Sequence, residues 1–132
     1  MNAAVASLML LAAQFVGARV PAEPPRIEMV SPATLQQRFC QGKPCRMEAM
    51  HLDGTIFLSE TLLGQPEVMR EAVLLHELVH YVQHVHDLGN GTCIGHRMLE
   101  DEAYAAQEYY LESRGVFIEG LRMRAVTLVC ED

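Results

Sequence analysis

Apolar positions follow two patterns along this chain of 132 residues. Residues 66–88 and 96–113 repeat apolar side chains every three or four positions, which is the spacing of one face of an α-helix. Shorter apolar runs, of the length of a β-strand, lie at residues 27–30, 46–52 and 55–58. This mixture of helix-length and strand-length segments predicts an α+β domain.

Turn residues mark where these elements begin and end. Ser31 followed by proline predicts a helix over residues 31–39, because serine caps a helix and proline suits its first turn. The dipeptide Asp53-Gly54 favours a tight hairpin between two of the short runs. Pro66 starts the first long helix and Gly89 ends it.

These elements predict one domain over residues 19–132, with one modest core. We expect a small antiparallel sheet that packs on the helix of residues 66–88 and on the helix of residues 96–113. Residues 116–129 also have helical spacing and predict a third helix.

The first 18 residues have the features of a secretory signal peptide. They carry no charged side chain, they are mostly apolar, and Val16-Gly17-Ala18 ends in the small residue that a signal peptidase requires. We expect cleavage after Ala18 and an exported protein, periplasmic or secreted. No Lys or Arg precedes the apolar run, and an uncleaved anchor is the alternative. No stable membrane span is expected after signal removal, since the later apolar runs are short.

The charge of the chain limits the classes of partner that are expected. The net charge is −7, and the sequence has no basic patch and no alternation of basic and aromatic residues, so nucleic acid is not expected as a partner. A peptide or protein substrate is compatible with an acidic surface, although the net charge does not select one.

The four cysteines are Cys40, Cys45, Cys93 and Cys130. An even number after a signal peptide predicts disulfides in an oxidising compartment. The short spacing of Cys40 and Cys45, with Gly and Pro between them, favours one closed loop, which would leave Cys93 to pair with Cys130. Three pairings are formally possible, and the sequence does not choose among them. Zinc binding by the cysteines is disfavoured because the chain has no CxxC pair.

The motif HExxH, from His76 to His80, lies within an apolar, helix-forming segment. Because the two histidines are four residues apart, both imidazoles project from one face of a helix and could hold one divalent metal. Glu77 lies about a quarter-turn from His76, where it suits a base that takes a proton from water on the metal. The alternative is a pair of core histidines satisfied by hydrogen bonds, but burying such groups without a partner would be costly.

A third ligand is expected on the helix of residues 96–113. The small apolar face of this helix consists of Leu99, Ala103, Ala106 and Tyr110. Glu102 borders that face, so we predict that Glu102 completes the site, with Glu100 as the second candidate. His86 is a further candidate because it falls where the last histidine of the metzincin pattern HExxHxxGxxH falls, although Gln83 replaces the glycine of that pattern.

The segment TIFLSETLLGQPEVMREAVLLHELVHYVQH, followed by EDEAYAAQEYYLESRG, resembles the small gluzincin-type metallopeptidases. Its layout of strand, HExxH helix and glutamate-bearing helix is similar to that of ImmA/IrrE-like peptidases. It is more similar still to exported bacterial proteins with an HELVHxxQ helix and an EAYxxQ helix. The resemblance implies a minimal zincin-like fold in which His76, His80 and Glu102 bind Zn²⁺ and Glu77 is the general base.

Together these features predict a small exported zinc metallopeptidase that hydrolyses its substrate with water activated by Glu77. Tyr109 is a candidate donor to the oxyanion, with a packed core tyrosine as its alternative. The strand at residues 55–58 could pair with an extended substrate. Two other hypotheses stay open. One is a non-catalytic, metal-stabilised binding domain, which would not need a base beside the metal, and the other is a hydrolase of a non-peptide amide.

Overall fold

The computed structural model describes residues 3–45, 47–126 and 130. In chain order its elements are α1 (Ala3–Val16), β1 (Arg26–Val30), α2 (Pro32–Phe39), β2 (Ala49–Leu52), β3 (Thr55–Ser59), the 3₁₀ helix η1 (Glu60–Gly64), α3 (Glu67–Val85), α4 (Cys93–Glu112) and α5 (Met123–Val126). The predicted α+β class is confirmed, with helices packed against a small sheet.

The three strands form one sheet with the order β1-β3-β2. β2 and β3 form the predicted antiparallel hairpin, and Asp53 and Gly54 in its turn have φ of 48° and 86°, as a type I′ turn requires. β1 pairs with β3 in parallel, which makes the sheet mixed rather than purely antiparallel. The parallel pair is possible because α2, the loop after it and β2 lie between β1 and β3 in the chain and together form the long crossover that parallel strands need.

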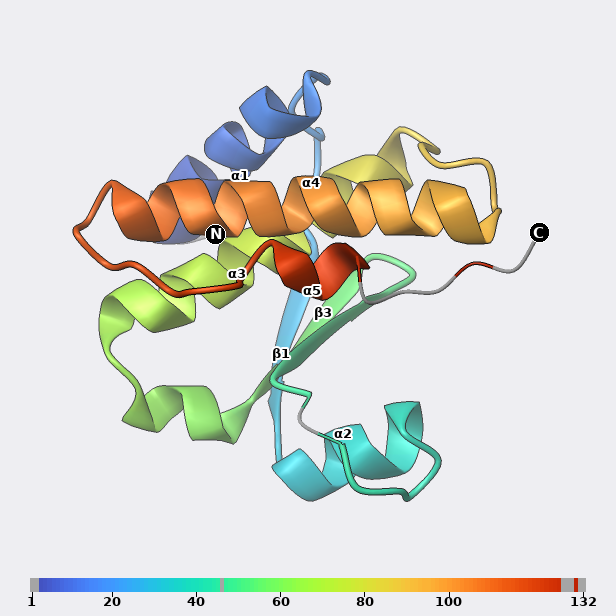
Figure 1. Ribbon diagram of the computed structural model, residues 1–132, viewed down its shortest axis with the longest axis vertical. Coiled ribbons are helices and arrows are strands. Elements are labelled where there is room, and N and C mark those ends of the chain that lie inside the picture. Colours follow the sequence, from blue (N-terminus) through green and yellow to red (C-terminus); the bar gives the residue numbers. More distant parts are fainter. Residues whose placement is uncertain (1–2, 46, 127–129, 131–132) are drawn as a thin grey trace.

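Helix α3 lies at the centre of the molecule (Figure 1). Its apolar residues Leu75, Leu78, Val79 and Val82 are fully buried, because α1 and α4 cover one part of its surface and the β2–β3 hairpin covers another. Successive residues of β3 point to opposite faces of the sheet. Ile56 therefore joins the core around α3, while Phe57 contacts Phe39 of α2. The sheet thus separates α2 from the helical layers.

Helix α1, the segment expected to be a signal peptide, packs on α3 and α4 (Figure 1). Leu8, Met9 and Ala12 belong to the buried core cluster, and Phe15 makes an edge contact with Tyr109 of α4, with ring centroids 5.3 Å apart. In the described part of the chain, no helix is long and apolar enough to cross a membrane.

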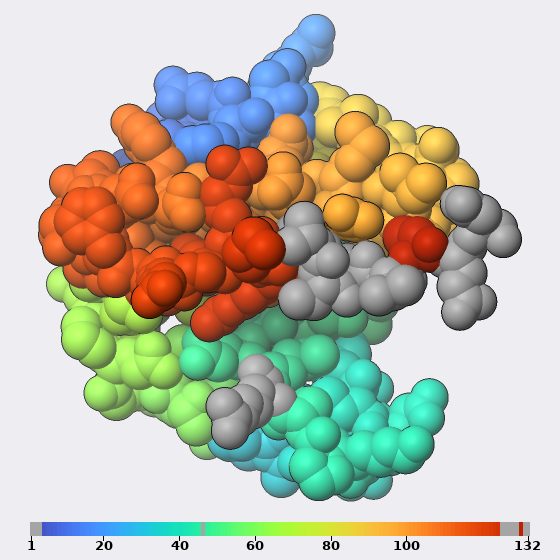
Figure 2. Space-filling model, viewed as in Figure 1, coloured from blue at the N-terminus to red at the C-terminus, as the bar shows by residue number. Residues whose placement is uncertain are grey.

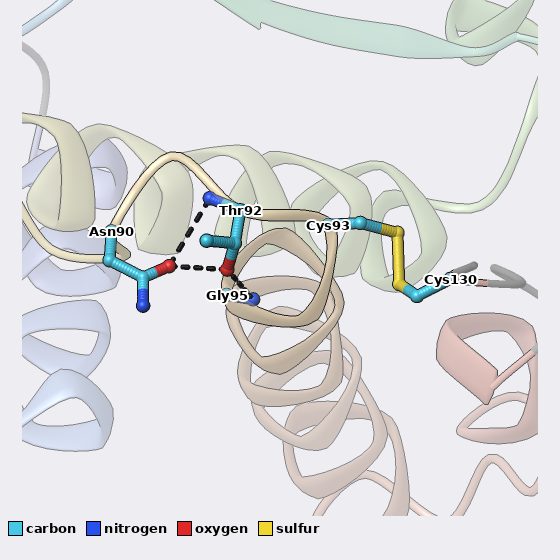
Figure 3. The surroundings of a disulfide bond; sticks show 5 residues. All are labelled: Asn90, Thr92, Cys93, Gly95 and Cys130. Carbon is cyan, nitrogen blue, oxygen red and sulfur yellow. Dashed lines mark hydrogen bonds between the residues drawn. A yellow bond between two sulfur atoms is a disulfide. The ribbon is translucent and has the colours of Figure 1, made fainter. Parts of the chain in front are cut away.

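Both disulfides are those that the cysteine spacing favoured, Cys40–Cys45 and Cys93–Cys130. The second bond lies beside the start of α4 (Figure 3). There the Thr92 hydroxyl accepts a hydrogen bond from the Gly95 N–H at 3.0 Å and donates one to Asn90. A Cβ atom on Gly95 would lie 2.5 Å from the Asn90 side-chain oxygen, so a larger residue at this position would force the cap to shift. The first turn of α4 is therefore fixed by a cap, a close approach and a cross-link.

Most predicted boundaries agree with the structure to within three residues. Ser31 caps α2 as expected. Thr92 caps α4, which therefore begins at Cys93, three residues before the expected start. Helical structure in residues 116–126 is limited to the four residues of α5, because Gly120 has φ of 73° and stops a helix from forming before it. The predicted third helix included residues 127–129, and the predicted strand at residues 46–52 included Arg46. These four residues lie outside the described part of the chain.

Candidate metal centre

Helix α3 directs the two histidines of HExxH to one side, as the four-residue spacing predicts. The ring centroids of His76 and His80 are 4.9 Å apart. Leu75 and Val79, which neighbour them in the sequence, belong to the apolar core, so packing of the apolar side chains fixes the rotation of the helix. The side chains of His76 and His80 are only 9% and 15% exposed, and they need polar partners at this depth.

The carboxylate that meets both histidines belongs to Glu100 of α4. One oxygen of Glu100 lies 3.3 Å from His76 Nε2 and also contacts His80 Nε2. Ligand atoms of His76, His80 and Glu100 all lie within 4.8 Å of one another, and they form the one group of this kind among the described residues. Two imidazole nitrogens and one carboxylate oxygen therefore converge from two helices on one point.

The structure does not bring Glu102, the expected third ligand, to this point. Two residues along a helix correspond to a rotation of about 200°, so Glu100 and Glu102 point to different sides of α4. Glu102 instead accepts a hydrogen bond from Gln83 Nε2 at 3.0 Å. The prediction of Glu102 took the small apolar residues as the face of α4 turned to the two histidines, but the stripe that faces His76 and His80 is polar.

That polar stripe consists of Glu100, Tyr104 and Gln107. At about 100° per residue, Tyr104 is about 40° from Glu100 and Gln107 is about 20° from it on the other side. The Tyr104 ring packs edge-on against His76, with centroids 4.4 Å apart, and Gln107 lies 3.0 Å from His76 Nδ1. The i, i+4, i+7 spacing of three polar residues was the signal in the sequence that could have identified Glu100.

Glu77 is buried beside the histidines, with 7% of its surface exposed. Burial raises the pKa of its carboxyl group, and this effect outweighs the opposing influence of His76, His80 and a hydrogen bond from the backbone N–H of His51. The hydrogen bond joins the HExxH helix to β2. Glu77 therefore lies next to both imidazoles, and its carboxylate also reaches the backbone of β2.

The charges of Glu100 and His80 depend on each other. Burial alone would raise the pKa of Glu100, but hydrogen bonds from His76 and His80 hold this pKa well below its usual range. Burial would lower the pKa of His80, whereas the hydrogen bond and the charge of Glu100 raise it. The carboxylate is therefore ionised and attracts a cation, either a proton on an imidazole or a metal.

Tyr109, the expected oxyanion donor, lies on the opposite side of α4. It is nine residues from Glu100, which corresponds to a rotation of about 180°, and it is 55% exposed beside Phe15 of α1. The tyrosine that borders the metal centre is Tyr104. Burial raises the pKa of Tyr104, as does the charge of Glu100, and its side chain hydrogen-bonds with Arg124 of α5.

A cleft of about 990 Å³ opens in front of the metal centre. Its walls include residues of β2, α3 and α4 together with Arg124. In the space-filling view the surface is hollowed between the half that contains α4 and the half that contains α2 (Figure 2). β3 is the central strand, so the expectation that residues 55–58 pair with a substrate is wrong. β2 is the strand at the sheet edge that borders the cleft.

His84 in the last turn of α3 and His86 directly after the helix do not belong to the group of His76, His80 and Glu100. His86, the metzincin candidate, lies at the end of the helix, where its Nε2–H donates a hydrogen bond to the Arg19 carbonyl oxygen at 2.7 Å. His84 lines the cleft beside His51, with ring centroids 5.1 Å apart. Burial, followed by the charges of His84 and His80, lowers the pKa of His51 to about 4. His51 is therefore neutral at pH 7.

Comparison of the chain with protein families, with curated proteins and with solved structures gave no match.

Proposed function

We propose that this protein is a small zinc-dependent hydrolase, and that its substrates are peptides or proteins. One observation carries the proposal: the donor atoms of His76, His80 and Glu100 converge within 4.8 Å, with the buried Glu77 carboxylate beside them. The disulfides are compatible with an exported protein. Cleavage after Ala18 stays a prediction.

The donor set fits zinc. Zinc prefers four ligands in proteins, and two imidazoles with one carboxylate are a known set for sites that leave the fourth position to water or substrate. A structural zinc site would instead close its coordination with a fourth side chain, and the described residues offer only these three donors. A zinc ion bound there would supply a Lewis acid and would lower the pKa of water to about 7.

The surrounding residues supply the other parts of a hydrolytic site. Glu77 is placed to accept a proton from the attacking water and to pass it to the leaving amine. Tyr104 and Arg124 line the same cleft and hydrogen-bond with each other, so we assign them the role of donors to the oxyanion in place of Tyr109.

The edge of β2 supports a peptide substrate. The ladder pairs Met50 with Phe57, and the Ser59 N–H donates to the Glu48 carbonyl at 2.8 Å. In an antiparallel ladder the residues between hydrogen-bonded pairs direct their N–H and C=O groups to the other side. His51 follows this rule, since its N–H reaches Glu77, and Ala49 occupies the equivalent position along the cleft. An extended peptide could add to this edge beside the metal.

Metal analysis and a substrate screen test the proposal. Protein purified from the exporting host without chelator should contain about one zinc per chain, and a peptide library should reveal hydrolysis that chelation abolishes and zinc restores. A folded chain without metal would contradict the whole proposal. Zinc without hydrolysis of peptides or other amides would favour the alternative, a metal-stabilised binding domain.

A further inference from the structure

Two buried glutamines contact the histidines from behind. Gln83 Oε1 lies 2.8 Å from His80 Nδ1, and Gln107 Oε1 lies 3.0 Å from His76 Nδ1. Gln83 is 1% exposed and Gln107 is 6% exposed. A buried glutamine is costly unless its amide is hydrogen-bonded. These residues are the two glutamines of the HELVHxxQ and EAYxxQ segments, to which the hydrolytic site described above gives no role.

The partners of Gln83 fix the direction in which its amide points. Its Nε2 atom lies 3.0 Å from the Leu99 carbonyl oxygen and 3.0 Å from Glu102 Oε1. Both of these oxygens accept hydrogen bonds, so the amide nitrogen must face them. The amide oxygen must then face His80, and because it can only accept, His80 Nδ1 must carry a hydrogen.

The hydrogen on Nδ1 determines the state of the other ring nitrogen, Nε2. With a hydrogen on Nδ1, the neutral His80 ring presents the lone pair of Nε2. That lone pair faces an oxygen of Glu100, and two acceptors that face each other need a cation between them, either a proton or a metal ion. The same arrangement holds at His76, where Gln107 stands at Nδ1 and Glu100 at Nε2.

We infer that Gln83 and Gln107 are positioning residues that hold His80 and His76 in the Nδ1–H tautomer with Nε2 aimed at one metal, and that Glu102 anchors Gln83, an assignment that rests on the metal-binding part of the proposed function. Each histidine thus has its own glutamine, one from α3 and one from α4. Residues behind metal ligands commonly contribute 10–100-fold to metal affinity by fixing the ring and its tautomer.

Two substitutions of Gln107 distinguish a positioning role from simple packing, because the two hypotheses predict opposite orders of zinc affinity. Gln107→Met keeps the length of the side chain but offers at best a weak acceptor, so zinc affinity should fall about 10–100-fold. Gln107→Glu restores a strong acceptor for Nδ1–H, so it should bind zinc at least as tightly as the natural chain. If Gln107 only fills space, Gln107→Met should bind zinc normally and Gln107→Glu, which buries a charge, should be the damaged variant.

Zinc affinity is measured on the full chain by competition with a chromogenic chelator, and the visible spectrum of the Co²⁺ form reports ligand geometry independently of catalysis. Gln83→Met should match Gln107→Met in both measurements. Gln65→Met is the control, because Gln65 contacts Glu48 and neither histidine. Thermal unfolding of each metal-free variant shows whether it folds. If Gln107→Met does not fold, the comparison of Gln83→Met with Gln107→Glu still tests the proposal.

The possible failures are distinguishable. If the natural chain binds neither Zn²⁺ nor Co²⁺, the proposed function fails and the assignment of the glutamines fails with it. If the natural chain binds metal and both methionine variants bind it equally well with an unchanged Co²⁺ spectrum, the metal centre stands and the role of the glutamines is overturned.

Discussion

The backbone N–H of His51 in the edge strand β2 donates a hydrogen bond to the carboxylate of Glu77 on α3. This bond attaches the candidate base to the strand along which a peptide could lie. It leaves the remaining lone pairs of the carboxylate for water. One residue of α3 therefore couples the sheet edge to the metal centre.

Glu77→Gln should separate chemistry from binding. The amide oxygen can still accept the His51 N–H, so the fold and zinc affinity should persist, but the proton acceptor is lost. We expect hydrolysis to fall about 10²–10⁴-fold, the usual contribution of a positioned base. The measurement is the rate on a responsive peptide at equal zinc content. An unchanged rate would show that the hydrolysis comes from another site.

The two neighbouring glutamates of α4 should respond oppositely to the same substitution. Glu100→Gln replaces an anionic donor at the centre of the cluster, and zinc affinity should fall at least about 100-fold, because even residues behind the ligands contribute 10–100-fold. Glu102→Gln keeps an oxygen that can accept from Gln83, so affinity should change less than about threefold. Chelator competition measures the zinc affinity of both variants. If Glu102→Gln loses more affinity than Glu100→Gln, Glu102 is the third ligand after all.

The outcome at these two residues shows how far the sequence could predict the site. HExxH lies on one helix, and its geometry follows from the helical repeat alone. The third donor comes from a second helix, and its identity depends on the rotation of α4 about its own axis. That rotation is set by contacts that no local pattern contains, such as Gln83 with the Leu99 carbonyl.

The fold was predictable to a similar degree. Ser31 and Asp53-Gly54 specified a cap and a turn through their local chemistry, and both are present. The parallel pairing of β1 with β3 depends on contacts between residues about 29 positions apart, which a single sequence does not reveal. The same limit applied to Tyr109, whose ring packs on α1 because of the way the helices cross.

Gly95→Ala should destabilise the protein although alanine favours helices. The added Cβ would lie 2.5 Å from the Asn90 side-chain oxygen and 3.1 Å from the Thr92 hydroxyl, so the cap of α4 must shift. Loss of a cap costs about 0.5–2 kcal/mol, and this cost together with the strain of the close contact should exceed the helix-propensity gain of up to about 1 kcal/mol. Gly64→Ala is the control, because nothing lies within 4 Å of its added Cβ. Urea unfolding should rank Gly95→Ala as the less stable variant.

Tyr110 should make stability depend on alkaline pH. Its hydroxyl donates to Glu71, and burial followed by this hydrogen bond raises the pKa of Tyr110 to about 12. Because this pKa lies above the usual value of about 10, the stabilisation is complete below pH 10 and is lost as the pH rises toward 12. On metal-free protein, the advantage of the natural chain over Tyr110→Phe should therefore shrink between about pH 10 and about pH 12. A constant difference in unfolding free energy would contradict this assignment.

The packing of α1 gives the predicted signal peptide a structural consequence. Cleavage after Ala18 would remove Leu8, Met9 and Ala12 from the core cluster and would uncover apolar residues of α3 and α4. Burial of a leucine-sized or methionine-sized side chain is worth about 1.5–3 kcal/mol, and small domains have only about 5–15 kcal/mol of stability. Intact mass of exported material would establish whether Arg19 is the first residue.

Two leucines on α1 test this packing in the full chain. Leu8 is 5% exposed and Leu10 is 54% exposed, so the same change at each site compares a buried position with a surface position on one helix. Leu8→Ala should lower the free energy of unfolding by about 2–4 kcal/mol, because it removes buried methyl groups and leaves a cavity. Leu10→Ala should change it by less than about 0.5 kcal/mol. Urea unfolding of both variants, with intact mass confirming that residues 1–18 are present, measures the difference. Equal stabilities would mean that α1 does not pack on α3 and α4 in solution, and the domain would then be residues 19–132 alone.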